Sequence, residues 1–456
     1  MKNKLYLFIA GCWALVLSSC LDSGGLDREY EVDRDCQITS FSLQSDSVSG
    51  LDEVKFTIDQ VNGRIMNLDS MPYGTEIEKV VCTVSIGSYV GRIEVFQQAT
   101  GDTLDWNQKD SLDFSQPVRF VTSSTDRTVS KEYLAYVNIH QVVPDSLPWS
   151  LYTDEMIGQT MVEQRVIPYS DGETDYYYMY MRPTSQGAYH LYRSAEADAK
   201  EWSEITLSGL PESGVDLAQI TRFEDKMYVP ATDGSLYESP DGSEWTRVTE
   251  TPEVVSLLGS MRPNVNQPAR LSAIIRYEGV LQFAAMMTDG EWQVGAEVPT
   301  DFPIAGFASL PISLMYRERI LIVGGRASND ALQNISWATM DALTWAKMTD
   351  LQSHYFSARA GSMMAYYDDK YYLIGGIDEN GTPLKDIYTS TDYGVTWKLQ
   401  DEMVILPAEY QARGYASMLV DADNFLLIFG GKTNETGSFL DEIWKGRINR
   451  LGFERQ

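Results

Sequence analysis

Alternating apolar and polar residues form short runs along most of the chain, for example over residues 370–374 (KYYLI). Such alternation predicts half-buried β-strands, because successive side chains of a strand point to opposite faces of a sheet. Glycine-containing turns separate the runs, and long stretches with helical periodicity are missing. The pattern therefore predicts an all-β protein.

The first region, residues 36–143, has the pattern of a small domain. Turn-forming pairs, Asn62-Gly63 and Tyr73-Gly74, separate its strand-like runs. These runs cover residues 38–43, 53–58, 80–86, 92–96 and 131–140. About a hundred residues with short strands favour a β-sandwich-like domain. The proline-marked segment 142–148 predicts a boundary, so a second domain is expected at residues 144–456.

The second region repeats with a period near 50 residues. Hydrophobic runs end in diglycines at 324–325, 375–376 and 430–431, and an aromatic run follows each. Alignment with three degenerate earlier copies gives Tyr192, Tyr237, Phe283, Trp337, Tyr388 and Trp444, at spacings of 45, 46, 54, 51 and 56 residues. A tryptophan follows in most copies, at Trp202, Trp245, Trp292, Trp345 and Trp397.

This repeat predicts the blades of a β-propeller. The six aligned copies predict about six blades, although the first three lack the diglycine, which leaves the count open by one. Trp149 lies 53 residues before Trp202, in the register of a closing tryptophan, yet no blade precedes it. We therefore expect the strand at Trp149 to complete the last blade. We also expect the diglycines to let the inner strands approach their neighbours closely.

The first twenty residues have the features of a secretory signal. Lys2 and Lys4 precede a short apolar run over residues 5–17, which ends at Ser18-Ser19-Cys20. This ending resembles the bacterial lipobox, whose cysteine takes a diacylglyceryl group and becomes the mature N-terminus. The resemblance implies a signal peptide at residues 1–20 with Cys20 as the lipid-attachment site. Residues 21–35, charged and glycine-containing, are expected to form a flexible tether.

The residue after Cys20 bears on the compartment. Leu21, rather than an aspartate, follows the cysteine. In the sorting pattern of Gram-negative lipoproteins, this resembles delivery to the outer membrane. We therefore expect an outer-membrane lipoprotein of the cell envelope, facing the periplasm or the cell surface. Its only membrane contact would be the lipid anchor.

Composition and charge narrow the chemistry. The formal net charge of −29 repels phosphate backbones, so no nucleic-acid partner is expected. The chain has only three histidines and no metal-binding Cys/His spacing, so no metal or other cofactor is predicted. Outside the signal, the only cysteines are Cys36 and Cys82. A disulfide between them and two buried free thiols both remain open.

A second motif occurs within the repeats. Residues 390–397 match the Asp-box pattern S-x-D-x-G-x-T-W, and residues 339–345 and 239–245 are imperfect copies. In Asp-boxes, the aspartate bonds the backbone amides of its own turn and the tryptophan packs between strands. We therefore interpret the aspartates of the three copies as structural rather than catalytic. They are Asp241, Asp341 and Asp392.

The combination of diglycines and trailing aromatic residues resembles the kelch-repeat propellers, including those like the central domain of galactose oxidase. The resemblance covers roughly residues 149–456 and is sharpest over 304–444. The order of lipobox, small β domain and propeller also resembles a group of uncharacterised two-domain lipoproteins from Bacteroidetes. That group has no established activity, so this second resemblance implies an architecture and no chemistry.

Two enzyme readings can be weighed against the residues present. Galactose-oxidase chemistry needs copper, two histidines and a thioether-linked cysteine, but the second region has two histidines and no cysteine. Sialidases need three arginines, a Tyr/Glu pair and an acid/base aspartate, and no spacing identifies such a set. No catalytic residue is therefore assigned.

A repeated segment leads into the predicted inner strands. In kelch proteins, arginines at this position line a pocket near the axis, so the resemblance implies that the aligned arginines converge at one end of the propeller. Guanidinium groups and aromatic faces suit sugars, carboxylates or acidic peptides. Ordinary salt bridging is the alternative. The ligand-binding candidates are Arg270, Arg359 and Arg413, Phe307 in the same register, and the neighbouring Tyr355 and Tyr410.

The sequence thus favours non-catalytic binding of a glycan or a protein through a propeller face. One alternative is a glycan-active, sialidase-like hydrolase, and another is a structural subunit of a surface complex. A pair of carboxylates in a deep axial cleft would favour the enzyme. A shallow site of arginine and tyrosine side chains would favour glycan or peptide binding, and a large flat apolar patch would favour a protein partner.

Overall fold

The computed structural model describes residues 35–450, apart from 88–89, 266, 315–316 and 349–354. The chain divides into two compact units, Met1–Val143 and Pro144–Gln456. The predicted signal peptide with Cys20 and nearly all of the predicted tether lie outside the described residues. Among the residues described, none forms a helix long and apolar enough to cross a membrane.

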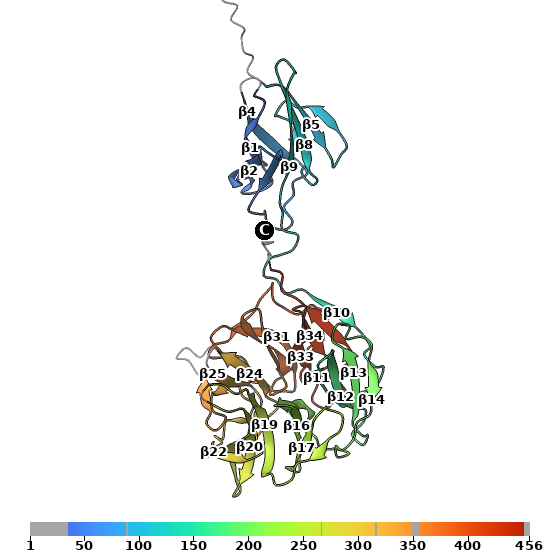
Figure 1. The fold of residues 1–456 in the computed structure, drawn as a ribbon, viewed down its shortest axis with the longest axis vertical. Coiled ribbons are helices and arrows are strands. Elements are labelled where there is room, and N and C mark those ends of the chain that lie inside the picture. Colours follow the sequence, from blue (N-terminus) through green and yellow to red (C-terminus); the bar gives the residue numbers. More distant parts are fainter. Residues whose placement is uncertain (1–34, 88–89, 266, 315–316, 349–354, 451–456) are drawn as a thin grey trace, which may run out of the picture. The chain divides into compact units, whose positions relative to one another are not determined.

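The first unit is a sandwich of two β-sheets (Figure 1). One sheet has the order β1 (Ile38–Gln44), β4 (Val80–Ile86), β7 (Ser111–Leu112). The other has the order β2 (Phe56–Asp59), β3 (Arg64–Asn67), β9 (Ser130–Tyr136), β8 (Val118–Ser124), β5 (Val90–Gln97), β6 (Thr103–Asp105), and a short 3₁₀ turn, η2 (Leu51–Glu53), precedes β2. Buried side chains of both sheets form one core, in which the rings of Phe41 and Phe120 lie 5.8 Å apart.

The two cysteines of this unit are free thiols. Cys36 precedes β1 and Cys82 lies in β4, and both are buried. Burial raises the pKa of the Cys82 thiol, because the charged thiolate loses its hydration. Of the two arrangements left open by the sequence, the structure therefore has the pair of buried free thiols and not the disulfide.

The second unit is a propeller of six four-stranded blades (Figure 1). The first three blades are β11 (Glu163–Ser170), β12 (Asp175–Arg182), β13 (His190–Ala195), β14 (Ser203–Ile205); β15 (Thr221–Phe223), β16 (Lys226–Pro230), β17 (Leu236–Ser239), β18 (Thr246–Arg247); and β19 (Glu253–Met261), β20 (Arg270–Tyr277), β21 (Val280–Met286), β22 (Trp292–Glu297). The next two are β24 (Ala308–Leu314), β25 (Arg317–Val323), β27 (Ser336–Thr339), β28 (Ala346–Met348); and β29 (Met363–Tyr367), β30 (Lys370–Ile377), β31 (Pro383–Ser390), β32 (Lys398–Leu399).

The sixth blade closes the ring. It contains β33 (Ser417–Val420), β34 (Leu426–Phe429) and β35 (Ile443–Gly446), and its fourth strand is the early β10 (Trp149–Thr153). Trp149 pairs with Gly446, and Leu151 pairs with Trp444. The strand at Trp149 therefore completes the last blade, as the spacing of the tryptophans predicts. Two further short strands, β23 (Pro303–Ala305) and β26 (Arg326–Ala327), form a separate ribbon, and a 3₁₀ turn, η3 (Leu217–Gln219), precedes β15.

The repeated aromatic residues hold neighbouring blades together. All six aligned aromatics lie in the third strand of a blade. Between the fourth and fifth blades, Leu321 and Ala338 of one pack in the same core as Leu373 and Trp397 of the other. Each blade thus buries its faces against its neighbours, which is why isolated copies of the repeat would lack a complete core.

The diglycines do not lie in the inner strands, which corrects the expectation from the sequence. They close the second strand of a blade and contact the segment that leads into the next one. Gly376 N–H donates to the carbonyl of Arg413 at 3.0 Å, and Gly325 N–H donates to that of Arg359 at 2.8 Å. A Cβ on Gly375, whose φ is +64°, would lie 2.6 Å from the Arg413 carbonyl oxygen. Glycine is therefore required by both the backbone conformation and the close approach.

The motif aspartates hold their own turns, in agreement with the structural interpretation. Asp392 accepts hydrogen bonds from Thr396 N–H at 2.9 Å, from the Thr396 hydroxyl at 2.6 Å and from the Ser390 hydroxyl at 2.8 Å. Asp341 and Asp241 make the same kinds of bond in their turns. With both carboxylate oxygens engaged locally, these aspartates are bound to the framework of the blades.

Candidate functional site

A cavity of about 1090 Å³ runs along the propeller axis. The inner strands of all six blades line it, namely β11, β15, β19, β24, β29 and β33. The lead-in end is the end at which these strands begin. The hairpin end is the end at which they turn into the second strands. Converging inner strands leave this space because their side chains cannot fill the centre of the ring.

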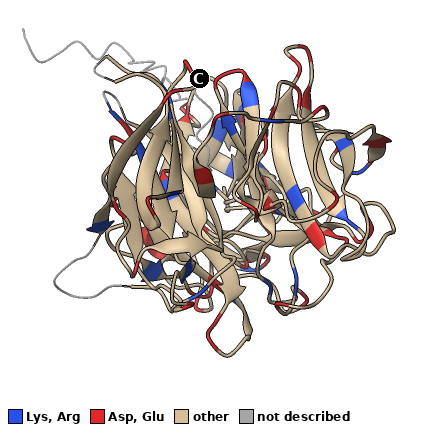
Figure 2. Cartoon of the chain, turned by 90° about the horizontal axis from the view of Figure 1, so that it is seen from below, with Lys and Arg blue, Asp and Glu red and all other residues tan. Residues whose placement is uncertain are grey.

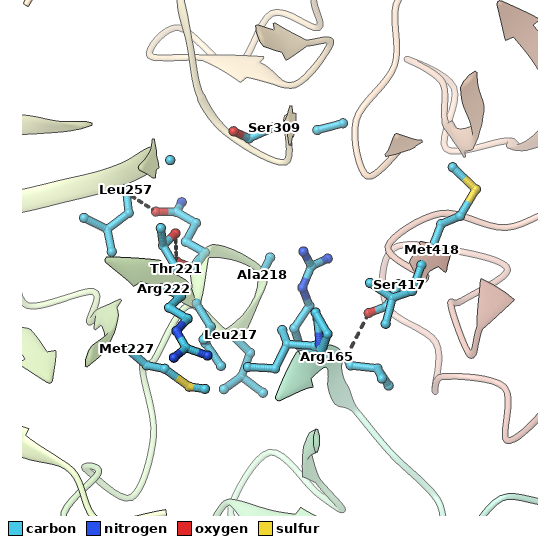
Figure 3. Close-up of a pocket in the computed structure, with 18 of the residues that line it drawn as sticks. Arg165, Leu217, Ala218, Thr221, Arg222, Met227, Leu257, Ser309, Ser417 and Met418 are labelled. Atoms are coloured by element: carbon cyan, nitrogen blue, oxygen red, sulfur yellow. Dashed lines mark hydrogen bonds between the residues drawn. The ribbon is translucent and has the colours of Figure 1, made fainter. Parts of the chain in front are cut away.

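Arg165, the third residue of β11, borders this cavity (Figure 3). Among the residues that the structure describes, its guanidinium group has no hydrogen-bond or ion-pair partner, and its Nε is buried. Burial lowers the pKa of Arg165, and the nearby charge of Asp216 opposes that effect. A cation without a partner at the wall of a cavity is costly for the fold, which is typical of a binding site.

Asp216 lines the same end of the cavity and caps the 3₁₀ turn η3. Its carboxylate accepts bonds from Ala218 N–H at 3.2 Å and from the Gln219 side-chain amide at 2.8 Å. Burial raises the pKa of this carboxyl, the charge of Glu163 raises it further, and the charge of Arg165 opposes both. The pKa of Asp216 therefore depends on the opposing charges of Glu163 and Arg165 at the lead-in end.

Glu163 begins β11 and shares its face of the strand with Arg165, because residues two apart in a strand point the same way. One carboxylate oxygen forms an ion pair with Arg182 of β12. The other, Oε2, is buried and has no hydrogen-bond partner within the described part of the chain. Buried polar atoms are normally satisfied, so this oxygen marks a place where a bound molecule or water can donate.

Lys432 and Tyr415 complete the lead-in end. The Lys432 ammonium lies 5.1 Å from the centre of the Tyr415 ring and 5.3 Å from that of Phe439. It donates to the carbonyl of Glu435 at 3.0 Å, and burial lowers its pKa. We call Glu163, Arg165, Asp216, Tyr415 and Lys432 the lead-in cluster; all five line the cavity.

The hairpin end is more open and mixed in charge. Arg222 in β15 and Arg262 after β19 line the cavity there, and no described residue forms a hydrogen bond or ion pair with either side chain. Three exposed acids, Asp175, Glu224 and Asp225, lie at the same end. Acidic and basic residues are similarly intermixed over the loops of the propeller rather than segregated by sign (Figure 2).

Only one of the sequence candidates lines this cavity. Phe307 does so, immediately before β24. Arg359 and Arg413 do not, and neither side chain is exposed at all. Arg359 binds both oxygens of Asp386, at 2.6 and 2.8 Å, and Arg413 binds Glu442 at 2.6 Å. The two arginines are therefore not free at one end of the propeller, and the salt bridging considered as the alternative is what the structure has.

The other three candidates also pack within the framework. Arg270 donates to the carbonyl of Asp341 in the next blade. The Tyr410 ring lies 4.1 Å from the Arg413 guanidinium, and Tyr410 is 2% exposed. Tyr355 packs, partly buried, against the core that the third and fourth blades share.

Sequence reasoning missed the lead-in cluster for a definable reason. Arg165 and Glu163 belong to the first blade, which lacks the diglycine, and they lie inside the inner strand rather than in the segment before it. The sequence did contain one sign of this site. Glu163 and Arg165 are two charged residues at alternate positions, directly before the apolar residues 166–167. No group of three or more potential metal ligands occurs among the described residues.

The comparisons with known proteins place this architecture in a family. A family model described as the DUF6242 beta propeller domain matches residues 143–456. A second, described as the DUF6242 N-terminal domain, a domain of unknown function, matches residues 31–137. No curated protein matches the chain. The solved structures that match include "Structure of YjhT", at 15% identity and a TM-score of 0.45, covering 64% of this chain and 96% of that one.

Proposed function

Because the chain belongs to the DUF6242 family, whose C-terminal domain is a β-propeller, we propose that it is a binding protein of the cell envelope with a small glycan as its ligand. The observation that supports this proposal is the axial cavity of about 1090 Å³. Ligand pockets of proteins typically have volumes of about 300–1,000 Å³, and this cavity, at the upper end of that range, has room for a sugar or a short oligosaccharide.

The lining of the cavity is compatible with a sugar. Polar groups from several blades border it, and apolar side chains such as Phe307 and Met364 lie among them. Sugars present hydroxyl groups at their edges and apolar C–H faces, and sites that bind them combine hydrogen-bonding groups with apolar or aromatic surfaces. The proposed ligand would lie along the axis between inner strands of different blades.

The proposal includes the anchoring and the repeat type expected from the sequence. A lipidated Cys20 would hold the protein at the outer membrane, and residues 21–35 would tether it. The propeller would be of the kelch type with Asp-box turns at residues 239–245, 339–345 and 390–397. Metabolic labelling with a fatty acid tests the anchor, since Cys20→Ala would abolish the label.

A hydrolase is the second candidate, and one observation favours it. Glu163 and Asp216 are two carboxyl groups in the same deep cavity, and burial with the charge of Glu163 raises the pKa of Asp216. Carboxyl pairs with separated pKa values carry out acid–base chemistry in glycoside hydrolysis. A search for reducing-end products from each glycan that binds separates a hydrolase from a binder.

The test is a thermal-shift screen of residues 21–456 against host and plant glycans, with sialylated members included. A ligand at about a hundred times its Kd stabilises the fold by ~2.7 kcal/mol. The variant Ala218→Trp places a bulky group in the cavity at an exposed position, and Ala296→Trp places the same group on the outer strand β22. Loss of the shift in Ala218→Trp alone supports the cavity. Equal shifts in both variants would place binding elsewhere.

A further inference from the structure

We infer that the ligand of the axial cavity carries a carboxylate and that the Arg165 guanidinium binds it. The inference rests on the proposed function, since it names the chemical class of ligand for that cavity. Three observations carry it: an arginine and, on the same face of β11, a carboxylate oxygen that both lack partners in the described part of the chain, and the balance of charges along the cavity wall.

The lack of a partner among the described residues sets Arg165 apart from the two fully buried arginines of the propeller. Arg359 and Arg413 each bind a carboxylate and two backbone carbonyls. The chain has 65 acidic residues against 36 basic ones, so partners are abundant. Arg165 nevertheless binds none of the described acids, and its side chain borders the cavity (Figure 3). A planar guanidinium that borders a cavity and has no carboxylate partner in the described part of the protein can form two parallel hydrogen bonds with the carboxylate of a ligand.

The carboxylate oxygen of Glu163 that lacks a described partner adds a second requirement for the ligand, namely a hydrogen-bond donor. Glu163 Oε2 can only accept a hydrogen bond, and it lies on the face of β11 that carries Arg165. A ligand that satisfies both groups must present an anion to Arg165 and a donor, such as a hydroxyl group, to Glu163. Hydroxylated carboxylates, such as the acidic sugars, meet both conditions.

The surrounding charges favour a carboxylate over a phosphate. The cavity wall carries four cationic side chains and seven acidic ones. The cations are Arg165, Arg222, Arg262 and Lys432, and the acids are Glu163, Asp175, Glu196, Asp216, Glu224, Asp225 and Glu318. A phosphate monoester carries about −1.5 to −2 charges at neutral pH, and a carboxylate carries one. The acidic wall therefore repels the phosphate more strongly, while the single charge is matched by Arg165.

Matched ligands and variants test this class directly. The probes are galacturonate, glucuronate and N-acetylneuraminate, each compared by calorimetry with its uncharged methyl ester, and glucose 6-phosphate as the dianion. We expect at least one acid to bind roughly 10- to 100-fold more tightly than its ester, the effect typical of a hydrogen-bonded charge. Arg165→Gln should abolish that preference, and Arg165→Lys should restore part of it.

A second arginine variant serves as the control. Arg317→Gln removes the same charge from an exposed position of β25 outside the cavity wall and should keep the preference. Equal binding of acid and ester, unchanged by Arg165→Gln, overturns the carboxylate inference and leaves cavity binding intact. Tighter binding of glucose 6-phosphate than of every acid overturns it as well. If no probe binds while neutral glycans in the screen do, the carboxylate class is wrong; if nothing binds, the proposed function fails with it.

Discussion

The carboxylate of Asp386 accepts hydrogen bonds from both terminal nitrogens of Arg359, at 2.6 and 2.8 Å. Arg359 belongs to the segment before β29, and Asp386 lies in β31 of the same blade. The same arginine donates to the carbonyl of Gly375 at 3.0 Å, and its own carbonyl accepts from Gly325 of the preceding blade. Arg359 thus connects the segment before β29 to β30 and β31 of the same blade through its side chain, and to the diglycine of the preceding blade through its backbone.

This relationship predicts a large cost for removing the carboxylate. Asp386→Asn leaves the Arg359 guanidinium, which is 0% exposed, without its counter-charge. Breaking a buried pair in this way typically costs about 3–5 kcal/mol. Urea unfolding of the whole chain measures the loss. Asp330→Asn is the control, because the Asp330 side chain is 83% exposed in its pair with Arg326 and should cost less than about 1 kcal/mol. Equal losses of unfolding free energy in the two variants would show that the buried Arg359–Asp386 pair contributes no more to stability than the exposed Arg326–Asp330 pair.

The contrast between Arg359 and Arg165 shows what the sequence could and could not predict. The period of aromatic residues and diglycines predicted the propeller, its six blades and the closing strand at Trp149, because these features depend on spacing along the chain. The alignment of Arg359 and Arg413 predicted that both converge on a pocket at one end of the propeller, whereas the structure buries both side chains outside the cavity wall. The alignment could not show that Asp386 and Glu442, 27 and 29 residues further along the chain, occupy both guanidinium groups.

The lead-in cluster lay beyond sequence reasoning for a related physical reason. Arg165 and Asp216 are about 50 residues apart and belong to different blades. Their proximity depends on the radial arrangement of the blades, and the lack of a described partner for Arg165 depends on all the side chains around the axis. A repeat pattern identifies what the copies share, whereas this cluster occurs once.

A second prediction concerns the closure of the ring. A Cβ added to Gly446 would lie 2.5 Å from the Trp149 indole on the pairing strand β10. Gly446→Ala should therefore cost about 1–3 kcal/mol, as overpacking does. The double variant with Trp149→Leu should lose less than the sum of the two single changes, because the smaller side chain relieves the clash. Additive losses in a double-mutant cycle would contradict direct contact as the cause.

A third prediction follows from the raised pKa of Asp216. Burial raises this pKa above its ordinary value of 3.8, so the protonated carboxyl is favoured in the folded protein. The resulting stabilisation is fully present below pH 3.8 and is lost as the pH rises through the raised pKa. The free energy of unfolding of Asp216→Asn minus that of the wild type should therefore increase from acidic to neutral pH. Chemical unfolding across that range measures the difference, and a difference that falls with rising pH would contradict the sign.

The fourth prediction has the opposite sign and concerns Asp392. Burial alone would raise the pKa of this carboxyl, but the hydrogen bonds from Thr396 and Ser390 outweigh it and lower the pKa below 3.8. Its stabilisation is therefore present above pH 3.8 and is lost as the pH falls through the lowered pKa. Asp392→Asn should cost about 1–2 kcal/mol at neutral pH, since charge-assisted bonds to the turn are weakened.

The cost of Asp392→Asn should shrink as the pH falls below 3.8, where the wild-type carboxylate is itself protonated. Urea unfolding at neutral and acidic pH provides both values. Asp423→Asn, at an exposed position where no described residue forms a hydrogen bond or ion pair with the side chain, should change stability little at either pH. A cost for Asp392→Asn that stayed constant down to acidic pH would mean that the amide loses shape complementarity in the turn rather than charge.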